Sequence, residues 1–204
     1  MKFVKKMPKI DKDLSEQLIK EGWKKIKEPH SMGATLLAAM PLMLLSLGLT
    51  YAVVYPFYNM LAPIQQFIAH GFSFTINLLK VFGVLLALYF YVVIHELLHG
   101  VMIPDFYKSK QTFWGLTIQG GFVFTTEELT KKRFLLISIL PYLALTVGVS
   151  VIFGLLGMLN SFILFLVIIN AAGSCVDFLN IVLITFQVPS GSKIVNNGFE
   201  TFYK

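Results

Sequence analysis

One five-residue segment of this chain has side chains that could hold a metal ion: His95-Glu96-Leu97-Leu98-His99. On a helix, positions i and i+4 lie on the same face, so both imidazoles can bind one ion. The glutamate beside the first histidine can act as general base on the attacking water. The HExxH spacing therefore predicts metal-assisted hydrolysis, with His95 and His99 as ligands and Glu96 as the catalytic base.

A zinc site of this type needs a third protein ligand and leaves the fourth position for water. Asp177 is favoured because it is the only acid inside a later apolar segment, where a charge costs on the order of 2.5–3.5 kcal/mol. Glu127 and Glu128 are the alternatives, although acids cost little in the polar loop that holds them. The predicted ligands are thus His95, His99 and Asp177.

Small polar residues precede and follow Asp177 in the same apolar segment. Asn170, Ser174 and Asp177 are spaced i, i+4 and i+7, so they share a helix face, and Asn180 lies close to it. Asn170 and Asn180 are candidate substrate-binding residues, and hydrogen bonding between helices is the equally good alternative. Cys175 is expected to pack rather than to bind metal.

The elements that carry these residues are apolar throughout. Of 204 residues, 56% are hydrophobic and 14% are charged, and the mean hydropathy is +0.72. A soluble domain usually carries about 25% charged residues, so the composition excludes intrinsic disorder and argues against a soluble domain. It predicts an integral membrane protein. The single cysteine excludes an intramolecular disulfide.

The apolar segments predict an all-α integral membrane protein with about four transmembrane helices. They are expected at 34–55, 72–103, 134–157 and 162–186. Between the second and third spans, residues 112–126 are aromatic, β-branched and broken by glycines, which indicates a short β-hairpin-like insertion. The edge of one strand there could pair with an extended substrate, although an ordinary hairpin is equally compatible.

The basic residues predict the orientation of the chain. Nine of 17 lie in residues 1–30, five lie in 104–133 and two follow residue 187, which leaves Lys80. Four spans place all three basic segments on one side, so both termini are expected in the cytoplasm. We read residues 1–32 as a basic cytoplasmic tail, with an interfacial helix as the alternative, and residues 33–204 as the membrane domain. The charge of +6 is read as topology, with no nucleic-acid partner expected.

These motifs resemble two groups of membrane metallopeptidases. HExxH on one apolar helix and an Asp two helices later look like the site-2-protease type. A closer resemblance, over roughly residues 80–204, is to small bacterial membrane proteins described as putative zincin peptidases. It rests on 95–100, on the glycine-containing segment before Glu127, on 132–134 leading to Pro141, and on 170–177. The resemblance implies a zinc-dependent endopeptidase of the bacterial cell membrane that acts on membrane or membrane-associated proteins.

A different class of function stays open at this point. The histidines and acids could form a polar cluster in a non-catalytic membrane protein, such as a transporter subunit or a scaffold. No internal repeat relates the two halves of the sequence, which argues against a transporter. Bound zinc distinguishes the two classes.

Overall fold

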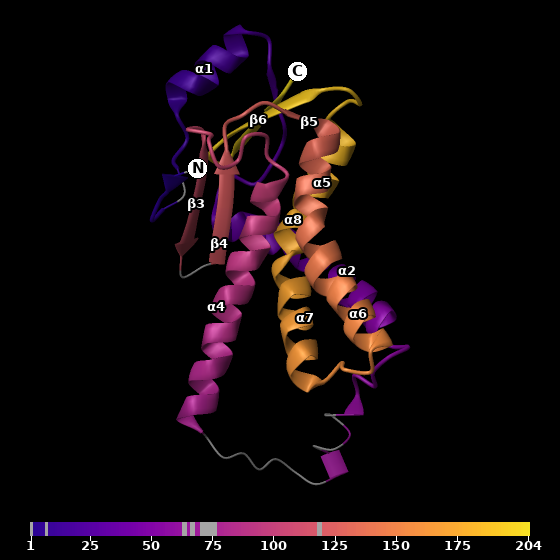
Figure 1. Cartoon of the computed structure of the whole chain (residues 1–204). Coiled ribbons are helices and arrows are strands. Elements are labelled where there is room, and N and C mark those ends of the chain that lie inside the picture. The colour runs from indigo at the N-terminus through magenta and orange to yellow at the C-terminus, as the bar shows by residue number, and fades with distance from the viewer. Residues whose placement is uncertain (1, 7, 63–64, 66–67, 70–76, 118–119) are drawn as a thin grey trace.

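The computed structural model describes the 204-residue chain except residues 1, 7, 63–64, 66–67, 70–76 and 118–119. The described part is mostly helical, and four helical segments are long and apolar enough to cross a membrane (Figure 1). These are Met32–Val54, Leu78–Val101, Lys131–Leu155 and Ser161–Gln187. The predicted set of four long apolar helices is therefore confirmed, and the predicted residues 72–76 of the second lie outside the described residues.

The first two spans are single helices, α2 (Met32–Val54) and α4 (Leu78–Val101). Each begins at a side-chain cap, because Ser31 and Asn77 accept a hydrogen bond from a backbone N–H of the first turn. Most residues in the first half of α4 are exposed. In a chain that crosses a bilayer, such apolar side chains face lipid.

The third span is interrupted at a proline. It consists of α5 (Lys131–Pro141), the π-helix η1 (Tyr142–Gly148) and α6 (Val149–Leu155). Proline lacks a backbone N–H, so it cannot donate to the carbonyl four residues earlier. In α5 that carbonyl belongs to Ile137, and the site described below uses it.

The fourth span consists of α7 (Ser161–Gly173) and α8 (Cys175–Gln187), separated by Ser174. The Ser174 amide still donates to the Asn170 carbonyl at 2.9 Å, so the two helices continue one another closely. Cys175 is buried beside Ala39 of α2 and Leu179 of α8, in agreement with its expected packing role.

Two small sheets lie at one end of the helices, together with both termini (Figure 1). The first has the order β1-β3-β4, in which β3 pairs parallel with β1 and antiparallel with β4. Its strands are Lys2–Phe3, Thr112–Thr117 and Gly120–Thr125. We call the second the terminal sheet; its order is β2-β7-β6-β5, with all neighbours antiparallel. Its strands, in chain order, are β2 (Lys24–Lys25), β5 (Leu129–Thr130), β6 (Lys193–Asn197) and β7 (Glu200–Tyr203).

The N-terminal segment packs against the C-terminal strands, and the division into a basic cytoplasmic tail at 1–32 and a membrane domain at 33–204 stays a prediction. Helix α1 (Lys12–Lys20) buries Leu18 in a core with Trp23, Val195 and Phe202. The Asn197 side chain accepts from the Asp11 amide at 3.0 Å and donates to the Asp11 carbonyl at 2.6 Å. These contacts join residues more than 180 positions apart, which local sequence patterns do not reveal.

Candidate metal centre

Three side chains from two helices converge where the helices meet the sheets. His95 and His99 lie one turn apart near the end of α4, and Asp177 lies in the first turn of α8. His95 Nε2 is 3.5 Å from Asp177 Oδ2, and His99 Nε2 is 3.3 Å from Asp177 Oδ1. Each side chain is 12–14% exposed, so the group is mostly buried but still reachable. We call these three residues the metal centre.

The spacing of the donor atoms fits a tetrahedral zinc ion. Zinc binds imidazole nitrogen and carboxylate oxygen at about 2.0–2.2 Å, so two ligands of a tetrahedral ion stand roughly 3.3 Å apart. His95 Nε2 stands 3.5 Å from one Asp177 oxygen and His99 Nε2 stands 3.3 Å from the other, both close to that value, and one ligand atom from each residue lies within 4.8 Å of the others. Two histidines and one carboxylate are also a donor set typical of catalytic zinc.

Asn170 on α7 orients the first histidine. Its Nδ2 donates to Thr146 Oγ1 at 2.9 Å and to the Pro141 carbonyl at 3.3 Å, which turns its Oδ1 toward His95. His95 Nδ1 stands 2.8 Å from that oxygen. Because the amide oxygen can only accept, the proton lies on His95 Nδ1, and Nε2 keeps a lone pair for metal.

A backbone carbonyl orients the second histidine. His99 Nδ1 donates to the Ile137 carbonyl at 2.9 Å, so its Nε2 also keeps a lone pair for metal. The carbonyl is free for this contact because Pro141, four residues later, has no N–H to occupy it. Pro141 of the third span thus helps to orient His99, although the metal centre itself lies on the second and fourth spans.

Glu96 is buried between α4 and strand β4. Its side chain is close enough to the metal centre to interact electrostatically with His95, His99 and Asp177. The Val123 backbone N–H donates to its carboxylate. A Cβ atom at Gly121 would stand 2.8 Å from Glu96 Cδ and Oε1, so only glycine leaves room for the glutamate there.

The alternative third ligands are engaged elsewhere. Glu127 accepts a hydrogen bond from Ser109 Oγ at 2.7 Å. Glu128 forms an ion pair with Lys193 at 2.6 Å, at the surface. Among the described residues, Asp177 is the acid that lies within ligand distance of both histidines. This agrees with the expectation that a carboxylate inside an apolar helix, which costs free energy, is present for a specific reason.

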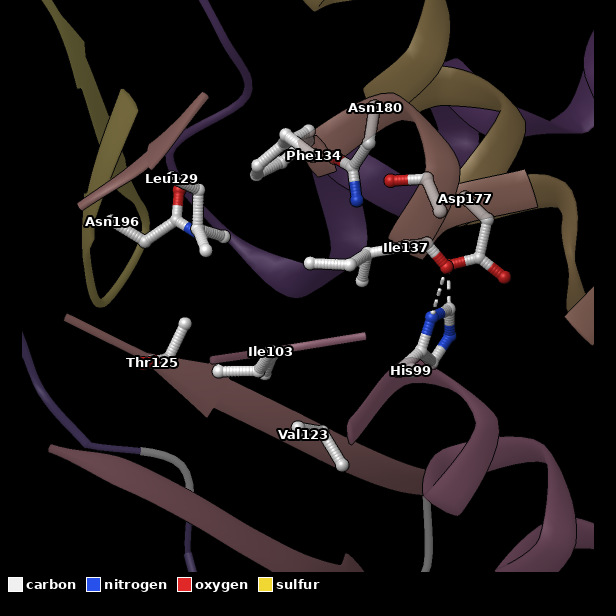
Figure 2. Close-up of a pocket in the computed structure, with 11 residues that line it drawn as sticks. His99, Ile103, Val123, Thr125, Leu129, Phe134, Ile137, Asp177, Asn180 and Asn196 are labelled. Atoms are coloured by element: carbon white, nitrogen blue, oxygen red, sulfur yellow. Dashed lines mark hydrogen bonds and ion pairs between the residues drawn. The ribbon is translucent and has the colours of Figure 1, made fainter. Parts of the chain in front are cut away.

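A cavity of about 110 Å³ opens beside the metal centre (Figure 2). His99 and Asp177 form one side, and Asn180 of α8 also lines it. Asn170 is not among the lining residues, because it lies behind His95. A substrate contact of Asn180 stays a prediction, and Asn170 has the interhelical hydrogen bonds that were its alternative.

Several lining residues carry no signal in the sequence. Val123 and Thr125 come from β4, and Asn196 comes from β6 of the terminal sheet. Asn196 lies 19 positions after Asp177, outside the apolar spans, where a polar residue needs no explanation. The glycines before Glu127 were the one hint, because a glycine inside a strand often marks a close approach.

Comparison with known families agrees with this geometry. A family model described as "Putative zincin peptidase" matches residues 88–193, about half of the chain. The chain belongs to this family. The match includes the metal centre, Glu96 and Asn170, and it agrees with the resemblance drawn from the sequence. A zincin family implies zinc, which the donor set fits. No curated protein and no solved structure matched the chain.

Proposed function

We propose that this zincin-family protein is a membrane-embedded zinc endopeptidase, with His95, His99 and Asp177 as ligands and Glu96 as the catalytic base. One observation carries the proposal. Each histidine Nε2 stands 3.3–3.5 Å from an Asp177 oxygen, close to the separation of two ligands on a tetrahedral zinc ion, and both Nδ1 atoms already have acceptors. A cluster that served packing alone would not need both Nε2 atoms turned toward one carboxylate.

The roles of the residues follow from their positions. Zinc, when bound, supplies Lewis acidity, which acidifies water and polarises a carbonyl. Glu96 takes a proton from the attacking water and delivers it to the leaving amine. Asn170 and the Ile137 carbonyl hold the two imidazoles in the ligating tautomer. Asn180, at the cavity, is placed to hydrogen-bond the substrate backbone.

Strand β4 offers a docking edge for the substrate. It pairs with β3 along its other edge, and the side chains of Val123 and Thr125, which share one face of the strand, line the cavity. An extended segment that pairs with this edge would pass beside the metal centre. The substrates we expect are membrane or membrane-associated proteins with an unfolded segment at the bilayer surface.

We infer that the site works at the cytoplasmic face of the bacterial membrane. His99 lies two residues before the end of α4, next to the sheets, so water can reach it from that side. Both termini lie at the same end of the helices (Figure 1), and the basic segments favour the cytoplasm for that end.

The decisive experiment measures zinc and activity in the same preparations. Purified wild type should carry about one zinc per chain and cleave an unfolded protein such as casein. His95→Ala and Asp177→Ala should lose the metal, whereas Glu96→Gln should keep it and lose activity. Glu128→Gln is the matched control, because its acid pairs with Lys193 at the surface, and it should keep both.

Two results would overturn the proposal. Stoichiometric zinc in Asp177→Ala would remove Asp177 from the ligand set. Cleavage by Glu96→Gln at the wild-type rate would show that the observed peptidase is a contaminant.

A further inference from the structure

The cavity beside the metal centre has the size of one amino-acid side chain. Its volume is about 110 Å³, and an apolar cavity of about 150 Å³ in another protein binds benzene. A leucine side chain therefore fits more easily than an indole ring. Since His99 and Asp177 form one side, a side chain inside the cavity would belong to a residue flanking the bond at the metal centre.

The walls of the cavity limit size. Ile103 follows α4, Phe134 and Ile137 lie on α5, and all three point into the cavity (Figure 2). Phe134 is 9% exposed and belongs to a packed core with Leu129 and Ile184, so it cannot swing aside without opening that core. The walls are therefore rigid, and they set an upper limit on what enters.

The same walls offer no partner for a charge. Among the described lining residues, those outside the metal centre are apolar or carry uncharged polar side chains, as Thr125, Asn180 and Asn196 do. Asp177 is the one acid, and its two oxygens face the two histidines. A lysine or glutamate side chain placed here would be buried without compensation.

We propose that this cavity receives the substrate side chain next to the cleaved bond and selects uncharged side chains from valine to about leucine or glutamine in size. The inference rests on the proposed peptidase function and adds its specificity. It assigns to Asn196, on the terminal sheet, a wall of the substrate pocket. Figure 2 shows Asn196 across the cavity from Asp177, so it meets the far end of such a side chain.

The test maps cleavage sites in a defined peptide mixture. Full-length protein in detergent, loaded with zinc, is incubated with synthetic peptides randomised at their central positions, and the products are sequenced by mass spectrometry. At one position flanking the cleaved bond we expect lysine, glutamate and tryptophan to be depleted about tenfold or more relative to leucine, as poor pocket fit commonly produces. Flat residue frequencies on both sides of the bond would overturn the inference.

Two variants should each admit a substrate side chain that wild type excludes. Misfolding or a general loss of activity would not produce such a change in preference. Phe134→Leu should admit phenylalanine at the selected position, and Asn196→Asp should admit lysine by supplying a carboxylate. Their matched controls are Phe165→Leu on α7 and Asn160→Asp at the α7 cap, which lie outside the cavity lining. Both controls should keep the wild-type preference.

The outcomes separate the two proposals. If wild type and Glu96→Gln are equally inactive toward all peptides while zinc is bound, the peptidase function itself fails. If wild type cleaves and Glu96→Gln does not, but Asn196→Asp and Phe134→Leu leave the residue frequencies unchanged, the pocket assignment fails and the peptidase function stands.

Discussion

The metal centre and the terminal sheet hold their polar groups in different surroundings. The three residues of the metal centre and the neighbouring Glu96 are ionisable side chains near the ends of apolar helices. Each has a defined neighbour: Asn170, the Ile137 carbonyl, Val123 or one another. In the terminal sheet, polar contacts are spread over the first 28 and last 12 residues of the chain. The first region gathers the residues of the proposed zinc site, and the second joins the two ends of the chain.

The two regions should therefore differ in how they respond when a polar residue is substituted. Inside apolar helices, a charge without a partner is costly, so few are present and each has a specific task. In the terminal sheet, stability comes from a shared core and from several hydrogen bonds, each worth about 0.5–1.5 kcal/mol. Substitutions at the metal centre should therefore remove function at constant stability, and substitutions in the sheet should do the reverse.

The largest effect is expected at Gly121. Alanine there would place Cβ against Glu96 and displace the carboxylate while the zinc ligands stay in place. Activity should fall about 10²–10⁴-fold, the usual contribution of a general base, while zinc content measured by mass spectrometry stays at the wild-type value. Gly83→Ala on α4 is the control, because nothing lies within 4 Å of its added methyl group. Full activity in Gly121→Ala would contradict the position of Glu96.

The next largest effect belongs to the terminal sheet. Phe202 is fully buried beside Leu18 and Trp23, so Phe202→Ala should cost about 3–5 kcal/mol of stability. Hydrogen exchange at Val195 should accelerate, whereas zinc content should remain, since the ligands lie on α4 and α8. Phe186→Ala, which removes a phenyl ring that is 83% exposed, is the control. Loss of zinc in Phe202→Ala would show that the two regions are not separable.

A smaller effect is expected for Pro141→Ala, which should raise stability but weaken metal binding. Alanine is favoured over proline in a helix by about 3 kcal/mol, and its new N–H can bond to the Ile137 carbonyl. That bond competes with His99, so zinc affinity should fall about 10–100-fold, as for other lost partners of ligating histidines.

Chelator competition measures the affinity of Pro141→Ala, and chemical denaturation measures its stability. Pro41→Ala is the matched control, because Pro41 also lies inside a helix but is exposed on α2. It should change zinc affinity little. Equal affinities for Pro141→Ala and wild type would rule out this role of the proline.

These two regions also differ in what the sequence predicts. His95, Glu96, His99 and Asp177 stand out because charged and imidazole side chains inside apolar spans need a reason to be there. Asn196, Val123 and Gly121 do not stand out in this way, because their contacts with the cavity or with Glu96 of α4 arise only when distant segments of the chain meet. The pairing of β2 with β7 joins Lys25 to Phe202, and no local pattern encodes such a contact. The long helices and the grouping of His95, His99 and Asp177 were therefore predictable, and the walls of the cavity were not.

The smallest effect is expected at Glu28, where the terminal sheet reaches the cavity beside the metal centre. Glu28 accepts from the Thr201 amide at 2.5 Å, and the Thr201 hydroxyl faces both Glu28 Oε2 at 3.0 Å and Asn196 Oδ1 at 3.2 Å. One hydroxyl proton cannot serve two acceptors fully. If Glu28 is protonated, it donates to Thr201, whose hydroxyl then donates to Asn196.

Burial raises the pKa of the Glu28 carboxyl above its ordinary value of 4.5, which agrees with that preference for the protonated form. A raised acid pKa gives a contribution to stability that is complete below pH 4.5 and is lost as the pH rises through the folded-state pKa. Glu28→Gln supplies the donor at every pH. It should stabilise the terminal sheet at pH 7 by about 0.5–1.5 kcal/mol, the value of one hydrogen bond, and remove this part of the pH dependence. Denaturation of both proteins between pH 4 and 8 checks it, and parallel stability curves would show that Thr201 already satisfies both acceptors.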